Sequence, residues 1–119
     1  MSPLALVLAA LAGGLGAAAR YLVDRGVSRL AGARFPWGVF LVNVTGSFAL
    51  GVVTGALPEA VFVVGAGLLG GYTTFSTAML DVVALWRDGS RRASAFNAWG
   101  MLLVSVLAAF GGLALGATL

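Results

Sequence analysis

Long uncharged stretches alternate with short polar segments along the chain. The uncharged stretches cover residues 2–19, 35–58, 60–80 and 93–119. Each is long enough, or nearly so, to cross a hydrocarbon core of about 30 Å as a helix that rises about 1.5 Å per residue. The pattern predicts an all-α membrane protein in which one domain, residues 1–119, holds four transmembrane helices. Their expected bounds are about 3–23, 37–57, 60–86 and 94–117.

The composition agrees with a protein embedded in a lipid bilayer. Hydrophobic residues make up 61% of the chain and charged residues 9%, against about a quarter in soluble domains. A soluble domain, a nucleic-acid-binding protein and a disordered tail are excluded. The chain has no cysteine and no histidine, which removes thiolate, zinc and imidazole chemistry. Without them no nucleophile–base pair can be assembled, so we do not expect an enzyme.

The arginines predict the orientation in the membrane. All seven basic residues fall in, or at the border of, the connectors after the first and third helices: Arg20, Arg25, Arg29, Arg34, Arg87, Arg91 and Arg92. Positively charged connectors stay in the cytoplasm, which puts both termini outside. The first stretch lacks the basic residue that precedes a signal peptide, so we interpret it as a retained helix. We expect a multi-pass protein of a bacterial inner membrane.

The middle of the third helix carries an unusual polar sequence, Gly70-Gly71-Tyr72-Thr73-Thr74-Phe75-Ser76-Thr77. Serine and threonine can bond back to their own helical turn, which would leave the helix intact. Two adjacent glycines followed by four hydroxyl side chains instead favour a break. Unpaired backbone groups are tolerated at this depth only inside protein or along a watery path. A broken helix exposes carbonyls that can hold a cation and N–H groups that favour an anion.

The second helix carries a polar stripe. Asn43, Ser47 and Thr54 lie within about 40° of one another at 100° per residue, while Thr45 points to the opposite side. Such a stripe either bonds neighbouring helices together or lines a path, and the first reading is slightly favoured. Asp81 is the carboxylate deepest in an apolar stretch; a functional role and a place near the membrane interface both stay open.

Two motifs and one pair resemble the Fluc-type fluoride channels, the CrcB family. They are the segment Gly38-Val39-Phe40-Leu41-Val42-Asn43-Val44-Thr45-Gly46-Ser47-Phe48, the third-helix sequence from Gly70 to Thr77, and the Arg20-Tyr21 pair at the end of the first helix. The resemblance covers essentially the whole chain. It implies an antiparallel, dual-topology dimer with two fluoride pathways, and Arg20 is expected to mark the orientation at the mouth of the path.

The resemblance also implies roles for individual residues. A buried structural sodium ion would be held at the dimer axis by the backbone carbonyls of Gly70 and Thr73 from each subunit. The fluoride pathway would include the Asn43 amide, the ring edge of Phe75 and further polar side chains: Ser47, Thr74, Ser76, Thr77, Asn97 and Ser105. A fluoride ion gives up its water reluctantly, and such donors can replace that water.

The chain departs from the family pattern at two positions. Ala78 stands where the family has a second phenylalanine, and Met101 replaces the middle hydroxyl of a polar track formed with Asn97 and Ser105. The one-sided arginines also disfavour a homodimer whose copies insert in opposite directions. We therefore expect one half of an antiparallel heterodimer that exports fluoride passively.

Two other functions stay open. The first is a non-conducting scaffold subunit that completes a partner's channel. The second is a small multidrug-type transporter, which the missing acid in residues 2–19 disfavours.

Overall fold

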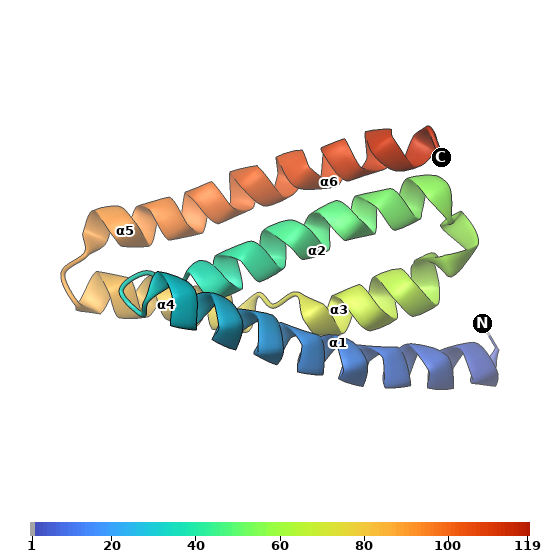
Figure 1. The fold of residues 1–119 in the computed structure, drawn as a ribbon, viewed down its shortest axis with the longest axis horizontal. Helices are drawn as coiled ribbons and strands as arrows, with labels where there is room; N and C mark the ends of the chain where they lie inside the picture. Colours follow the sequence, from blue (N-terminus) through green and yellow to red (C-terminus); the bar gives the residue numbers. More distant parts are fainter. Residues whose placement is uncertain (1) are drawn as a thin grey trace.

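The chain folds into four long helices that run back and forth along one axis (Figure 1). The computed structural model describes residues 2–119 and places helices, turns and short connectors within them. The helices long and apolar enough to cross a membrane are Pro3–Ala31, Trp37–Ala56, Pro58–Arg87 and Arg91–Ala117. The predicted all-helical, four-span architecture is confirmed, and the chain is a multi-pass membrane protein.

The first helix, α1 (Pro3–Ala31), is longer than the sequence indicated. It begins at Ser2, whose hydroxyl oxygen accepts a hydrogen bond from the Ala5 N–H at 3.0 Å, with Pro3 in the first turn. We predicted an end near residue 23, followed by a connector. The structure instead continues one helix through Ala31. The following residue, Gly32, has a positive φ (+83°), a conformation that commonly ends a helix. Between residues 24 and 31 there is no proline and no pair of adjacent glycines to interrupt the helix.

The third span consists of several pieces. After α2 (Trp37–Ala56), the chain turns through a short 3₁₀ segment, η1 (Pro58–Ala60), into a π-helix, η2 (Val61–Leu69). One helical turn, α3 (Gly70–Tyr72), precedes the break, and α4 (Ser76–Arg87) follows it. The break covers residues 73–75, inside the sequence where it was predicted, although the two glycines themselves stay helical.

The fourth span is continuous. It consists of α5 (Arg91–Ala95), the π-helical η3 (Phe96–Gly100) and α6 (Met101–Ala117). Arg91 and Arg92, expected in the connector, form its first turn. Figure 1 shows the N- and C-terminal ends of the bundle together on the right, with the connectors between α1 and α2 and between α4 and α5 at the opposite end.

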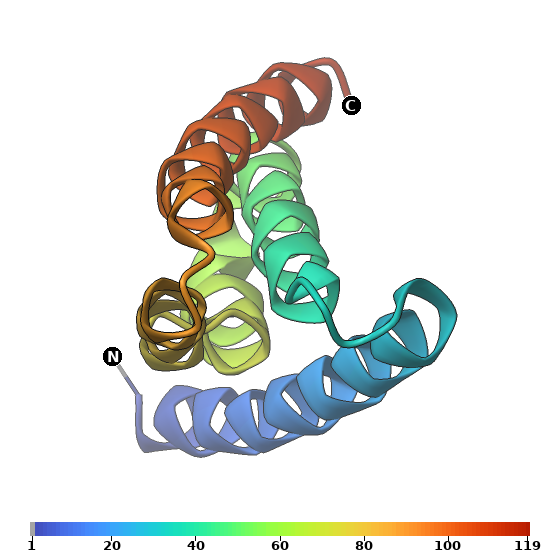
Figure 2. The ribbon, with the colours of Figure 1, turned by 90° about the vertical axis from the view of Figure 1, so that its left-hand side faces the viewer.

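Glycines set how closely the helices approach. A Cβ atom on Gly51 of α2 would strike the Ala109 backbone of α6, and one on Gly112 of α6 would strike the Phe48 backbone of α2. Gly71 meets the backbone of Gly13 on α1 in the same way. Figure 2 shows α1 crossing beneath the other helices, while α6 and α2 lie side by side in both views. Backbone packing through small residues is the usual means of helix association in lipid.

Candidate functional site

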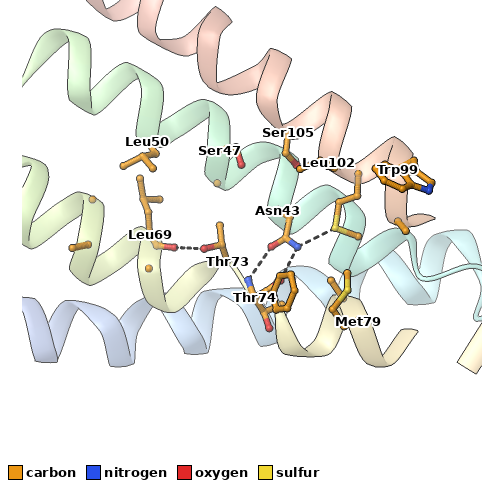
Figure 3. A pocket seen from close by; sticks show the side chains of 18 of the residues that line it. Asn43, Ser47, Leu50, Leu69, Thr73, Thr74, Met79, Trp99, Leu102 and Ser105 are labelled. Atoms are coloured by element: carbon orange, nitrogen blue, oxygen red, sulfur yellow. Dashed lines mark hydrogen bonds between the residues drawn. The ribbon is translucent and has the colours of Figure 1, made fainter. Parts of the chain in front are cut away.

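A cavity of about 810 Å³ opens beside the break in the third span (Figure 3). Its walls come from α2, η2, the break, the start of α4, η3 and α6. The lining residues are Asn43, Gly46, Ser47, Leu50, Val61, Gly65, Ala66, Leu69, Gly70, Thr73, Thr74, Phe75, Ala78, Met79, Ala98, Trp99, Met101, Leu102 and Ser105. The cavity therefore gathers polar side chains from three different spans at one level.

Asn43 ties α2 to the break. Its Nδ2 donates to the Thr74 carbonyl at 2.8 Å, and its Oδ1 accepts from the Thr74 backbone N–H at 2.9 Å. Nδ2 also donates to Sδ of Met101 on α6 at 3.1 Å. Figure 3 shows these bonds converging on the one side chain. A single amide thus replaces the helical partners that Thr74 loses where the helix opens.

The break also redirects two backbone donors. In an unbroken helix the Thr74 N–H would donate to the carbonyl of Gly70, and the Thr77 N–H to that of Thr73. Here the Thr74 N–H donates to Asn43, and the Thr77 N–H donates to the Thr74 hydroxyl oxygen at 3.2 Å. The carbonyls of Gly70 and Thr73 are therefore released from the helical ladder.

Those two carbonyls are the ones that the family resemblance assigned to sodium. Backbone carbonyl oxygens are suitable ligands for a hard cation such as Na⁺. In residues 2–119, no group of three or more Asp and Glu side chains is arranged to hold a metal ion. The two released carbonyls fit a cation held by backbone oxygens, and this chain would contribute two of them.

Most of the predicted pathway residues gather at the cavity. Asn43, Ser47, Thr74 and Phe75 line it together with Ser105 from the opposite helix. The Phe75 side chain is 78% exposed, so its ring is free to meet an ion or a second subunit.

Other predicted residues lie away from the cavity wall. Ser76 and Thr77 begin α4 beyond the break, and Asn97 is buried in η3. Arg20 lies on α1. Thr54 bonds back to the Leu50 carbonyl at 2.8 Å, and so extends the polar stripe of α2 without lining the cavity.

Three buried polar groups have no hydrogen-bond partner among the described residues. Asn97 has no exposed surface, and neither its Oδ1 nor its Nδ2 is paired. The Ser105 hydroxyl and Oδ2 of Asp81 are likewise unpaired. Buried polar atoms in native proteins nearly always have partners, so these groups indicate a place for water, an ion or another chain.

Ala78 and Met101, the two departures from the pattern that the resemblance implies, belong to the same buried apolar cluster. Ala78 is 2% exposed and Met101 is 6% exposed, and both belong to one apolar cluster with Val39 and Phe40. A change of side-chain volume at either position would therefore be felt within the same close-packed cluster.

Part of the cavity wall and a polar pair on the other side of α2 were not predicted from the sequence. Trp99 and Leu102 line the cavity; the spacing of Ala98, Leu102 and Ser105 by four and then three residues is the helical signal that could have placed this face. On the other side, the Thr45 and Tyr72 hydroxyl oxygens lie 3.0 Å apart. This agrees with the prediction that Thr45 points away from the stripe.

Comparison with known proteins gives the family. Residues 7–117 match the family described as CrcB-like protein, Camphor Resistance (CrcB). The chain is similar to the fluoride-specific ion channel FluC of Agrobacterium fabrum, with 42% identity over 122 residues, which cover 96% of this chain and 97% of that protein.

Two further relatives are similar over nearly their whole length. The fluoride-specific ion channel FluC 1 of Symbiobacterium thermophilum is 46% identical over 118 residues, covering 92% of this chain and 95% of that protein. The protein of the same name from Leifsonia xyli is 43% identical over 122 residues, covering 98% and 89%. Because the relatives are named ion channels, the prediction that the chain is not an enzyme is confirmed. The match to the family over almost the full length, together with the broken third span, shows that this chain belongs to the CrcB family of membrane proteins.

Proposed function

We propose that the chain is a subunit of a passive fluoride channel that lets cytoplasmic fluoride leave down its electrochemical gradient. The observation that carries the proposal is the broken third span, whose polar groups gather at a cavity in a chain related end to end to proteins named fluoride-specific ion channels. A passive path needs no nucleotide and no coupling ion. It needs only groups that replace the water around fluoride.

The side chains near the break can replace that water. Hydroxyl and amide groups donate hydrogen bonds to an anion, and the positive edge of an aromatic ring adds a weaker attraction. Ser47, Phe75 and Ser105 line the cavity, and Asn97 carries two unpaired N–H donors in the same span as Ser105. No arginine lines the cavity, so a passing anion would not be held by a fixed positive charge.

A sodium ion on the carbonyls of Gly70 and Thr73 would supply structural positive charge at the break. This chain contributes the two released oxygens, and a twofold-related subunit would contribute the same pair. The redirected N–H groups of Thr74 and Thr77 support this assignment, because they leave both carbonyls without their helical donors.

We propose an antiparallel heterodimer rather than a homodimer. All seven arginines fall in residues 20–34 and 87–92, which form or border the two connectors predicted to be cytoplasmic, and such a bias fixes one orientation. A second copy would have to insert against it. A homologous partner with the opposite bias inserts the other way without conflict, which places the termini of this chain outside and those of its partner inside.

Fluoride efflux from liposomes tests the function. One preparation contains this chain alone, and another contains it together with a homologue of opposite arginine bias. Efflux from the mixture alone supports the heterodimeric channel. Efflux from the single chain supports the channel and overturns the heterodimer. If neither preparation moves fluoride, the channel proposal is overturned.

The scaffold function is the second candidate, and Met101 is the observation that favours it. Its sulfur accepts a hydrogen bond from the Asn43 amide, and it shares a buried apolar cluster with Ala78, where the family resemblance implies a phenylalanine. A scaffold subunit would leave conduction to residues of its partner. Substitutions of Phe75 or Ser105 in this chain would then leave efflux from the mixture unchanged, whereas a conducting subunit would lose part of its flux.

The orientation is tested separately by the accessibility of a tag at either terminus in intact cells. A single outward orientation supports the proposed topology and hence a partner of opposite bias. Equal populations of both orientations would overturn it, and a tag that is inaccessible at both ends would place the termini in the cytoplasm.

A further inference from the structure

The hydrogen-bonding capacity of Asn43 is already used within the chain. A side-chain amide has two N–H donors. One of them meets the Thr74 carbonyl at 2.8 Å and the other meets Met101 Sδ at 3.1 Å. An anion that approaches Asn43 therefore finds no free donor until one of these bonds opens.

The two bonds differ in strength. The carbonyl of Thr74 is a strong acceptor, and the same residue also donates its backbone N–H to Asn43, so opening this pair would release two backbone groups at once. A thioether sulfur is a weak acceptor. The bond to Met101 is therefore the one that an incoming anion can replace.

Met101 is also built to move aside. Its side chain has three rotatable bonds and no branch, which lets it adapt to irregular space. It is 6% exposed yet lines the cavity of about 810 Å³, so room exists beside it. Met79 lines the same cavity and packs against the same apolar cluster. No hydrogen bond found among residues 2–119 uses the Met79 sulfur.

We infer that Met101 is a positioning residue that controls access of fluoride to Asn43, because its sulfur holds the donor that the anion must capture. The inference rests on the proposed function, since it concerns the same ion and the same path. It assigns to Met101 an active role in holding Asn43, beyond the mere loss of a hydroxyl from the polar track.

The amide resonances of the Asn43 side chain report on this bond directly. We would record them by NMR for the full chain in lipid nanodiscs, together with the partner subunit if the chain requires one, and titrate with sodium fluoride against sodium chloride. Met101→Leu keeps the volume and removes the acceptor, whereas Met101→Gln offers a stronger carbonyl acceptor at a similar reach. Met79→Leu makes the same sulfur-to-carbon change without touching Asn43 and is the matched control.

The expected results differ in sign. Met101→Leu should shift one Asn43 N–H signal before any fluoride is added, and fluoride should then act at concentrations about 2- to 10-fold lower, as expected for the loss of one competing hydrogen bond. Met101→Gln should require more fluoride than the unsubstituted chain. Met79→Leu should behave like the unsubstituted chain, and chloride should have little effect in all of them.

The outcomes separate this inference from the proposed function. If liposomes conduct fluoride but the Asn43 signals respond equally in all variants, the role of Met101 is overturned and the channel stands. If no preparation conducts and no variant shows a fluoride response, the channel proposal fails and takes this inference with it. A response to Met101→Leu that Met79→Leu reproduces would also overturn the role, because it would reflect altered packing only.

Discussion

Asn43 and Asn97 are two asparagines with opposite surroundings. Asn43 on α2 makes three hydrogen bonds, two of them across the break to Thr74 and one to the sulfur of Met101. Asn97 in η3 is completely buried and has no partner for either polar atom among residues 2–119. The same type of side chain therefore has both polar atoms hydrogen-bonded in one region and neither polar atom hydrogen-bonded in the other.

The difference shows that buried polar groups have two distinct effects on the stability of this bundle. A buried amide with all its bonds made stabilises the backbone that it pairs. A buried amide with none made raises the free energy of the folded chain unless water, an ion or a partner completes it. We therefore propose that Asn43 mainly stabilises the open backbone at the break. We propose that Asn97 and Ser105 mainly bind a passing ion or contact a partner chain.

Asn43→Leu should have the largest effect on stability. It leaves the Thr74 N–H and carbonyl without partners and removes three hydrogen bonds, so we expect a loss of about 3 kcal/mol or more in the free energy of unfolding. Reversible unfolding by sodium dodecyl sulfate in mixed micelles measures this. An unchanged midpoint would show that the break is held by other contacts.

Ala78→Phe tests the apolar neighbours of Asn43. A phenyl ring at a position that is 2% exposed, against Met101 and Phe40, should cost about 1–3 kcal/mol through overpacking. Adding Met101→Ser should recover a large part of that cost, because the two side chains compete for one space. A double-mutant cycle measures the coupling; strictly additive effects would contradict shared space.

Asn97→Leu should act in the opposite direction to Asn43→Leu. Removing an unpaired buried amide should leave the free energy of unfolding of this chain unchanged or raise it by about 1–2 kcal/mol. Fluoride efflux should nevertheless fall, by about tenfold if a donor to the ion is lost. The same detergent titration and the liposome assay measure both. A large loss of stability would mean that Asn97 has a structural partner.

Ser105→Ala should give the smallest change, below about 0.5 kcal/mol, because its hydroxyl is unpaired in the chain. Ser94→Ala is the matched control. The Ser94 hydroxyl donates to the Val82 carbonyl at 2.7 Å and is 2% exposed, so its removal should cost about 1 kcal/mol. If both substitutions lowered the free energy of unfolding equally, the pairing of the hydroxyl would not determine its contribution to stability.

Local chemistry made several features predictable from the sequence. The uncharged stretches predicted the four spans, because a helix must match the thickness of the hydrocarbon core. The hydroxyl-rich sequence after Gly70-Gly71 predicted the break, because unpaired backbone groups need polar surroundings at this depth. Glycines four residues apart, at 51 and 55 on α2 and at 112 and 116 on α6, are a local pattern typical of close helix packing, and the structure brings these two pairs to one interface.

Features that depend on contacts distant in sequence were not predictable. Nothing near Asn43 in the chain indicates that it pairs with Thr74, 31 residues away, or with Met101, 58 residues away. The release of the Gly70 carbonyl follows from the contact between Asn43 and the Thr74 N–H. The length of α1 was underestimated for a local reason. The charged residues after position 23 are typical of a connector, but none of them ends a helix.

The π-helical turns of η2 determine where the chain tolerates insertions and deletions. Nine residues, Val61 to Leu69, are wound more widely than in an α-helix, and the break follows after the single turn of α3. Deleting one residue from η2 would rotate every following residue about the helix axis, and would point Thr73 and Phe75 away from the cavity. Insertions and deletions should therefore be tolerated in the connectors and rejected in this segment, whatever residues it contains.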